Sequence, residues 1–159
     1  SDAYEIAVLR EEKGSGGSAA VHDSYQIGTR LSVDMPGNHF GLHDDSRPAL
    51  LIAGGIGITP IKSMALALES RGAEFQLHYA GRSRKQMAFR DRLERQLQDR
   101  LHIYSAEDGE RLDIDSVLSG TNHNAIIYVC GPQRLTDAVK KAARELGIAR
   151  ERVRLELFA

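Results

Sequence analysis

The sequence predicts an α/β fold in which a parallel five-stranded sheet is doubly wound by helices. From Pro48 onward, short apolar runs alternate with segments whose apolar residues recur at helical spacing. Such alternation of strand and helix is typical of a parallel sheet with helices on both faces. The chain has 159 residues, 42% of them hydrophobic, so it is long enough to bury one sizeable core.

The expected elements follow from these runs and from the residues that flank them. Thr59 is expected to cap the first helix of this region, with Pro60 in its first turn and Gly72 after its end. The expected strands cover residues 49–53, 75–79, 101–104, 125–129 and 153–158, and the expected helices cover residues 59–71, 87–97, 114–118 and 132–146.

The first part of the chain has a different texture and is expected to form short strands and turns. Two apolar-rich runs, residues 4–10 and 30–33, lie on either side of the glycine- and serine-rich segment 14–18. That segment fits a tight loop at least as well as a flexible linker. The change in texture divides the chain into two expected domains, residues 1–45 and 46–159.

Composition and charge argue against several classes of protein. A net charge of -1 argues against electrostatic binding of nucleic acid. No apolar run approaches the roughly 18 residues of a membrane span, and the first residues lack a signal-peptide layout. The only cysteine, Cys130, fits a reducing compartment. His39 and His43 lack a nearby third ligand, so no metal site is expected. We therefore expect a soluble cytoplasmic protein with no membrane or nucleic-acid partner.

A glycine-rich turn follows the strand at residues 49–53. Gly54, Gly55 and Gly57 lead directly into the helix at Thr59, an arrangement that brings backbone N–H groups and a helix N-terminus to a phosphate. Glycines let the backbone approach a pyrophosphate with no Cβ in the way. The turn is not the ordinary Rossmann fingerprint, because the third glycine would then fall on Pro60. The alternative is a glycine turn that only reverses the chain.

A second motif, Cys130-Gly131-Pro132, lies between the strand at residues 125–129 and the next helix. The carboxyl ends of parallel strands share one edge of a sheet, so this motif is expected at the same crevice as the glycine turn. Taken alone, Cys130 is more typical of a buried small residue than of a reactive one.

Together the two motifs resemble the ferredoxin-reductase superfamily, in which GGxGxTP and CGP are pyridine-nucleotide signatures. More narrowly, the chain is similar to the phthalate dioxygenase reductase and vanillate demethylase reductase branch. The residues that carry the narrower resemblance are Tyr4–Val8, Gly16-Gly17-Ser18, His22-Asp23, Pro36, Asn38-His39-Phe40, Arg82, Ala88-Phe89, Glu156 and Phe158.

The resemblance implies a reductase component of an oxygenase system. Electrons would pass from NAD(P)H to a flavin, with FMN expected and FAD as the alternative, then to a [2Fe-2S] ferredoxin domain and a terminal oxygenase. The cysteines of that cluster are absent, so the ferredoxin domain is expected outside this chain. The upstream Arg-x-Tyr-Ser motif of the flavin domain is also absent. Residues 1–45 would be the later part of a flavin-binding β-barrel, and residues 46–159 the NAD(P)-binding domain.

The resemblance also implies roles for individual residues. The glycine turn would hold the NAD(P)H pyrophosphate, the Cys-Gly-Pro turn would border the nicotinamide, and Phe158 would lie against the flavin ring. Cys130 and Phe158 are the expected catalytic residues. The expected cofactor-binding residues are Gly54, Gly55, Gly57, Ile58, Thr59, Pro60, Arg82, Ser83, Cys130, Gly131 and Pro132 for the nucleotide, and Gly16, Gly17 and Ser18 for the flavin phosphate.

The choice between NADH and NADPH is ambiguous in the sequence. Gly81-Arg82-Ser83-Arg84 follows the strand at residues 75–79, with no acidic residue directly after it. An arginine here can accommodate a 2′-phosphate, which favours NADPH, whereas the branch resemblance favours NADH. We expect NADH, and we expect Arg84 to be a solvated loop charge. Two alternative functions stay open, a stand-alone NAD(P)H:flavin reductase and a non-catalytic nucleotide-binding module.

Overall fold

The computed structural model describes residues 3–157. The chain divides into two compact units, Ser1–His39 and Phe40–Ala159. This division lies before the expected boundary at residue 45. The physical reason is that Phe40 and Leu42 pack against the core of the second unit and His43 is buried in it.

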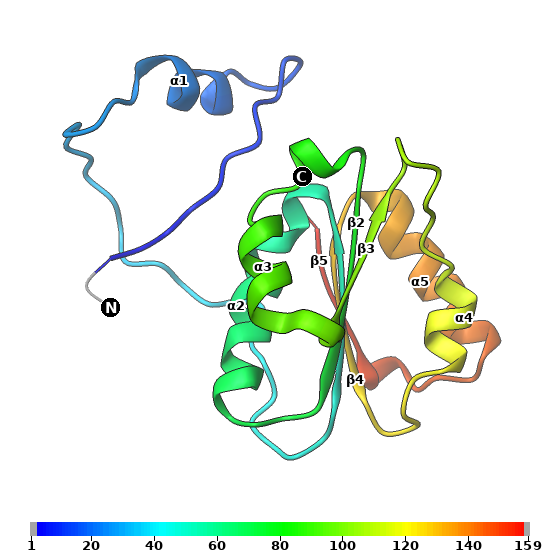
Figure 1. The fold of residues 1–159 in the computed structure, drawn as a ribbon. Coiled ribbons are helices and arrows are strands. Elements are labelled where there is room, and N and C mark those ends of the chain that lie inside the picture. Colours follow the sequence, from blue (N-terminus) through cyan, green and yellow to red (C-terminus); the bar gives the residue numbers. More distant parts are fainter. Residues whose placement is uncertain (1–2, 158–159) are drawn as a thin grey trace. The chain divides into compact units, whose positions relative to one another are not determined.

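The second unit is built on a five-stranded sheet in which every neighbouring pair of strands is parallel. Its strands are β1 (Ala49–Gly54), β2 (Phe75–Gly81), β3 (Leu101–Ser105), β4 (Ile126–Gly131) and β5 (Val153–Leu157), in the order β3-β2-β1-β4-β5. The predicted parallel five-stranded sheet is therefore confirmed (Figure 1). Phe158, the expected end of the last strand, lies outside the described residues.

Helices cover both faces of this sheet (Figure 1), as the doubly wound fold requires. The helices α2 (Ile58–Ser70) and α3 (Arg90–Leu97) lie on one face, and α4 (Ile114–Ser119) and α5 (Gln133–Glu145) lie on the other. Four single turns of 3-10 helix occur at η1 (Gly55–Gly57), η2 (Arg84–Gln86), η3 (Gln98–Arg100) and η4 (Arg150–Arg152). Among the described residues, no helix has both the length and the apolar content needed to cross a bilayer.

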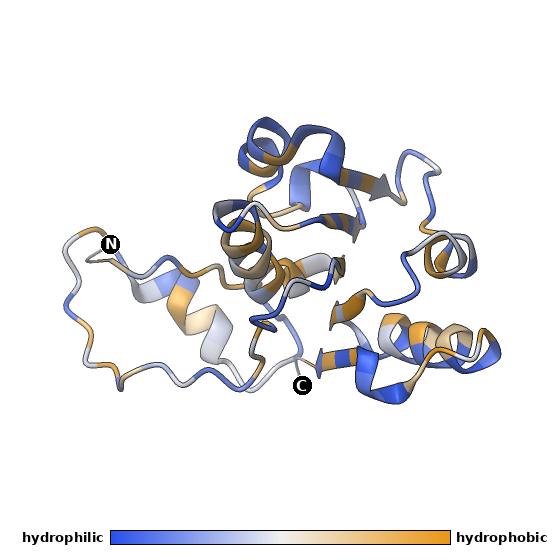
Figure 2. Ribbon diagram, turned by 90° about the horizontal axis from the view of Figure 1, so that it is seen from below, coloured by the Kyte–Doolittle hydropathy of each residue, from blue (hydrophilic) through white to orange (hydrophobic). Residues whose placement is uncertain are grey.

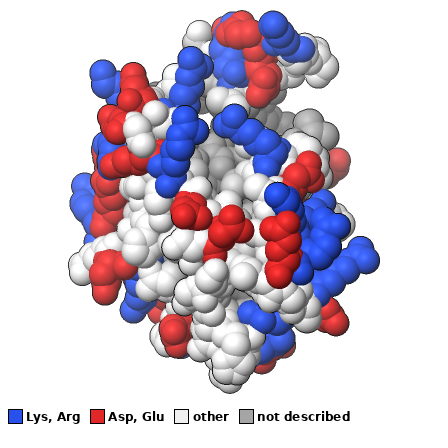
Figure 3. Space-filling model, turned by 90° about the vertical axis from the view of Figure 1, so that its right-hand side faces the viewer, with Lys and Arg blue, Asp and Glu red and all other residues white. Residues whose placement is uncertain are grey.

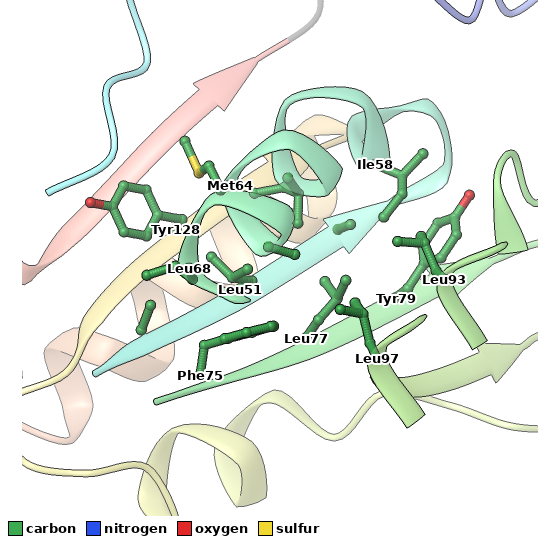
Figure 4. Packing of buried hydrophobic residues seen from close by; sticks show 14 of the residues in the cluster. Leu51, Ile58, Met64, Leu68, Phe75, Leu77, Tyr79, Leu93, Leu97 and Tyr128 are labelled. Atoms are coloured by element: carbon green, nitrogen blue, oxygen red, sulfur yellow. The ribbon is translucent and has the colours of Figure 1, made fainter. Parts of the chain in front are cut away.

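The core lies on either side of the two central strands. Every residue of β1 and of β4 is buried, which is the pattern of parallel strands covered on both faces. Leu51 packs towards α2 and α3, where Figure 4 shows it near Leu68, whereas its neighbour Ile52 packs in the cluster with α4 and α5. Burial of each such side chain contributes about 1.5–3 kcal/mol, so the central strands hold the unit together.

The predicted starts of α2 and α3 are wrong, by one residue and by three residues. Gly57 already has helical dihedral angles, so α2 begins at Ile58 and Thr59 is not its cap. Instead, the Thr59 hydroxyl donates a hydrogen bond to the Ile56 carbonyl at 3.1 Å. Helix α3 begins at Arg90 rather than residue 87 because Phe89 has a φ of 61°, which is incompatible with a right-handed helix. The predicted end of α2 is confirmed by Gly72, whose φ is 65°.

The first unit holds one helix in its described part, α1 (Gly17–Ser24). The short strands expected at residues 4–10 and 30–33 are not formed there, because a strand needs a hydrogen-bonded neighbour. Figure 2 shows both hydrophobic and hydrophilic residues along the first unit, and Leu31, Val33 and Met35 are exposed. Residues 8–11 are tied to α1 by several contacts. The Glu11 N–H donates to Ser18 Oγ at 3.0 Å, His22 Nε2 lies 2.8 Å from the Val8 carbonyl oxygen, and the Arg10 guanidinium pairs with Asp23.

Candidate dinucleotide site

The glycine turn after β1 and the Cys-Gly-Pro turn after β4 lie against one another. A Cβ added to Gly57 would lie 2.2 Å from the carbonyl oxygen of Cys130, and one added to Gly54 would lie 2.9 Å from Pro132 Cδ. A Cβ on Gly131 would lie 3.0 Å from Gly54 Cα. Such distances exclude side chains at all three glycines, so the structure brings the two predicted motifs together at one edge of the sheet.

Gly55 differs from the other glycines of the turn. Its φ is 55°, and a Cβ there would meet no atom within 4 Å. Space is therefore open in front of this residue, and its backbone conformation is one that favours glycine. An exposed backbone turn before a helix N-terminus is the arrangement that suits a phosphate.

Not every backbone N–H group of the glycine turn can donate a hydrogen bond to a phosphate. The Ile58 N–H is bonded to the carbonyls of Gly55 and Ile56, its side chain is fully buried, and Pro60 has no N–H. Ile58 and Pro60 therefore supply no backbone donor to a bound pyrophosphate, and the exposed Gly55 is the residue of the turn that faces open space. Helix α5 begins beside the same turn, with Pro132 as its N-cap and no side-chain capping bond, so a second positive helix end lies at this edge.

Cys130 is fully buried, and only Pro132 of its motif is exposed. It pairs with Ala53 of β1 on one side and Glu156 of β5 on the other. Burial, together with the charge of Glu156, raises the pKa of the Cys130 thiol to about 12. The thiol is therefore protonated at neutral pH and is not an activated nucleophile. The structure places this predicted catalytic residue in the wall of the site, where its role stays a prediction.

The end of β2 lies beside the loop that follows β3. The Ala106 N–H donates to the Gly81 carbonyl at 3.1 Å, and the Glu107 N–H donates to the Arg82 carbonyl at 2.9 Å. Arg82 is exposed and Ser83 is buried. The parallel register of β2 and β3, with Gly81 opposite Ser105, is what brings these two loops together.

Arg84 stays partly exposed, as the predicted solvated loop charge requires, but it is also paired with carboxylates. Its Nη2 donates to both carboxylate oxygens of Glu110 at 2.9 Å, and its Nε donates to Asp108 Oδ2 at 3.1 Å. Glu110 is itself held by the Ser105 N–H at 3.0 Å. Acidic side chains therefore do stand beside the end of β2, although they belong to the next strand's loop. The same edge argument, applied to the strand at residues 101–104, would have found them.

The remaining predicted residues lie elsewhere or outside the description. Gly16, Gly17 and Ser18 form the start of α1 in the first unit, where Gly16 has a φ of 94°. Phe158 falls outside the described residues. Within residues 3–157, no group of three or more His, Cys, Asp or Glu side chains is arranged to hold a metal ion.

Comparison with known families shows to which domain family this part of the chain belongs. Residues 51–141, which include both turns and most of the sheet, match the oxidoreductase NAD-binding domain. The chain belongs to this family. The match extends from β1 into α5 and so covers the elements that carry the glycine turn and the Cys-Gly-Pro turn.

Relatives of this NAD-binding domain include reductase components of oxygenases, as the sequence resemblance predicts. The chain is 38% identical over 157 residues to the carnitine monooxygenase reductase subunit of Escherichia coli, covering 98% of this chain and 49% of that protein. It is 35% identical over 156 residues to the vanillate O-demethylase oxidoreductase of Acinetobacter baylyi, covering 98% and 49%. The chain therefore spans about half the length of these curated relatives.

The solved structure of phthalate dioxygenase reductase has the same fold. It superposes with a TM-score of 0.87 at 32% identity, over 96% of this chain and 48% of that one. That protein is described as a modular structure for electron transfer from pyridine nucleotides to [2Fe-2S]. The predicted ferredoxin-reductase-like fold and the predicted branch are confirmed.

Proposed function

We propose that this chain is the nucleotide-binding part of an oxygenase reductase, which takes electrons from NADH and passes them through FMN to a [2Fe-2S] centre. One observation carries the proposal: the glycine turn and the Cys-Gly-Pro turn touch at the point where the strand order reverses. From β1 the chain runs outward through β2 and β3, and then returns to the other side of β1 for β4 and β5. In open α/β sheets, nucleotides bind in the crevice at such a reversal.

The turns have the shape that a dinucleotide requires. Gly54 and Gly57 let the glycine turn pack closely against the end of β4. Gly55 has a left-handed backbone and open space in front of it, a cradle that a side chain would fill. The pyrophosphate would be held there by backbone amides and by the N-terminus of α2. Thr59 supports the cradle by its bond to Ile56. The adenosine half would lie over the ends of β2 and β3, near Arg82 and Ser83, and the nicotinamide half beside Pro132.

The residues of this chain bind and orient rather than act as acid or base. The nicotinamide and the flavin supply the hydride chemistry when bound. Cys130 keeps its proton because its thiol is buried, and in our proposal it shapes the wall under the nicotinamide. Glu156 lies beside it on β5. Both groups would set the approach of the ring, where a displacement of about 1 Å can cost on the order of 10²-fold in rate.

The first unit is proposed as the later part of a flavin-binding domain. Helix α1 begins at Gly17, so the amides of Gly16, Gly17 and Ser18 form a helix start that suits the FMN phosphate. The Ser18 hydroxyl accepts the Glu11 N–H, which leaves its own hydrogen free to donate to a phosphate oxygen. The exposed apolar residues of the first unit fit a segment that packs in a larger barrel. The ferredoxin domain and the terminal oxygenase are the proposed partners beyond this chain.

The proposal is tested in two steps. Isothermal titration of the 159-residue chain with NAD⁺ should show one site. The full-length reductase that contains this chain, loaded with FMN, should then reduce its flavin and its iron–sulfur centre in that order on mixing with NADH in stopped flow. Flavin reduction followed by turnover on free FMN, with no iron–sulfur reduction, would instead support a stand-alone flavin reductase. Binding of NAD⁺ without any flavin reduction would support a non-catalytic nucleotide module.

A further inference from the structure

We propose that Glu110 and Asp108 hold Arg84 in an ion-pair clamp, and that this clamp selects NADH over NADPH. The inference rests on the proposed function, because it concerns the ribose end of the same dinucleotide site. It begins from the position of Arg84, two residues beyond Arg82 at the carboxyl end of β2. An arginine near this position is the residue type that accommodates a 2′-phosphate.

The clamp engages the Nε and Nη2 donors of Arg84. Its Nη2 contacts both oxygens of Glu110 at 2.9 Å, its Nε contacts Asp108 at 3.1 Å, and its Nη1 lies 3.8 Å from Glu94 Oε1. Three carboxylates therefore surround one guanidinium, so its positive charge is neutralised locally. A phosphate recognised by arginine needs a free, bidentate fork, and Glu110 and Asp108 compete with it for Nη2 and Nε.

The clamp is built into the backbone rather than formed by two mobile side chains. Glu110 Oε2 accepts the Ser105 N–H at 3.0 Å, and the Glu110 N–H donates to the Ser105 carbonyl at 2.9 Å. Glu110 is thus fixed to the last residue of β3, and Arg84 is drawn to it. Because β2 and β3 pair up to Gly81 and Ser105, the register of the sheet sets the position of the clamp.

The same carboxylates discriminate between the two cofactors by charge. A phosphate monoester carries about −1.5 to −2 charges at neutral pH, so a 2′-phosphate beside Glu110 and Asp108 is repelled. A 2′-hydroxyl is a hydrogen-bond donor, and a carboxylate can accept this hydrogen bond. Basic and acidic side chains are also interspersed over the face seen in Figure 3, rather than gathered into one basic patch. The site therefore favours the cofactor without the 2′-phosphate.

The test is the affinity of the full chain for NAD⁺ and for 2′,5′-ADP, a probe that carries the 2′-phosphate, measured by isothermal titration. The double variant Glu110→Gln, Asp108→Asn should bind 2′,5′-ADP roughly tenfold or more tightly than the wild type, which corresponds to about 1.4 kcal/mol. Adding Arg84→Ala to the double variant should abolish this gain, because the released guanidinium is what binds the phosphate. The matched control is Glu107→Gln, which removes a neighbouring exposed carboxylate that is not part of the clamp.

Each outcome separates the clamp from simpler explanations. A gain that persists without Arg84, or that Glu107→Gln reproduces, would mean that net charge alone acts, and would overturn the clamp. An unchanged affinity for 2′,5′-ADP in a folded double variant would do the same. Asp108→Asn alone leaves Glu110 and its backbone contacts in place, so its smaller expected gain decides the matter if the double variant does not fold. Failure of the wild type to bind NAD⁺ would overturn the proposed function instead.

Discussion

Gly57 packs directly against the carbonyl group of Cys130, so close that a Cβ on Gly57 would lie 2.2 Å from the Cys130 oxygen. Neither backbone can move away freely, because Cys130 lies in the buried strand β4 and Gly57 lies in η1, directly after the buried strand β1 with which β4 pairs. We predict that Gly57→Ala lowers the free energy of unfolding by about 1–3 kcal/mol, the usual cost of overpacking. Urea denaturation measures this, with Gly120→Ala as the control because its Cβ would lie 3.4 Å from the nearest atom. Equal losses in the two variants would contradict the close packing.

Gly55 should affect ligand binding rather than packing. Gly55→Ala places a methyl group in the open cradle and costs about 1–2 kcal/mol for the left-handed backbone. The matched control is Gly147→Ala, because Gly147 has a φ of 68°, equally open space around it, and a position after the end of α5. Both variants should lose similar stability, but only Gly55→Ala should weaken NAD⁺ binding in isothermal titration. Equal NAD⁺ affinities in the two variants would show that the pyrophosphate does not bind at this turn.

Cys130 should be inert towards alkylation in the folded chain. Its thiol is buried and its pKa is raised to about 12, so iodoacetamide at pH 8 finds neither access nor thiolate. Iodoacetamide should modify Cys130 slowly in the native chain and rapidly in denaturing urea, where the thiol has an ordinary pKa. Mass spectrometry measures the extent of modification. The rate in the native chain should not depend on NAD⁺. Rapid alkylation of the folded chain would show that the thiol is open to the crevice.

Tyr128 joins the segment before β1 to the edge of the sheet. Its hydroxyl oxygen accepts the His43 N–H at 2.7 Å and the Arg154 Nη1 donor at 3.2 Å, and lies 2.9 Å from His43 Nδ1. Tyr128→Phe removes the acceptor of the buried His43 N–H, whereas Arg154 Nη1 keeps the Gly41 carbonyl, so we predict a loss of about 1–3 kcal/mol in unfolding free energy. Tyr79→Phe is the control, because the equally buried Tyr79 hydroxyl makes one long bond of 3.3 Å, to the Ala88 carbonyl. A Tyr128 loss no larger than the Tyr79 loss would refute the network.

His78 makes stability depend on pH. Burial, with the nearby charge of His102, lowers the pKa of His78 from 6.5 to about 4. Between these values the unfolded chain binds a proton that the folded chain does not, so stability is present above pH 6.5 and is lost as the pH falls towards 4. His78→Gln should flatten the pH dependence of thermal unfolding in this window, and His123→Gln, at an exposed position, should not. If the pH dependence of thermal unfolding were the same in His78→Gln as in the wild type, His78 would not be its cause.

The sequence alone determined those features that depend on residues close together in the chain. The all-apolar runs at β1 and β4 predict buried parallel strands, and Gly72 predicts the end of α2 because a left-handed residue is needed there. The two motifs at strand ends could be placed at a common edge, because parallel strands carry their carboxyl ends there. That argument predicted the fold and a common edge for the two motifs, whereas the family was predicted from the resemblance of these motifs to known signatures.

The tertiary structure decided what depends on the register between distant segments. Glu110, which pairs with Arg84, lies 26 residues later in the sequence, in the loop after β3. Only the pairing of Gly81 with Ser105 brings this loop close to Arg84. Contact between Gly57 and Cys130 likewise needs the exact offset of β1 against β4. The hydrophobic pattern does not fix the offset of β1 against β4, because both strands are buried along their whole length and show no alternation that would set their register.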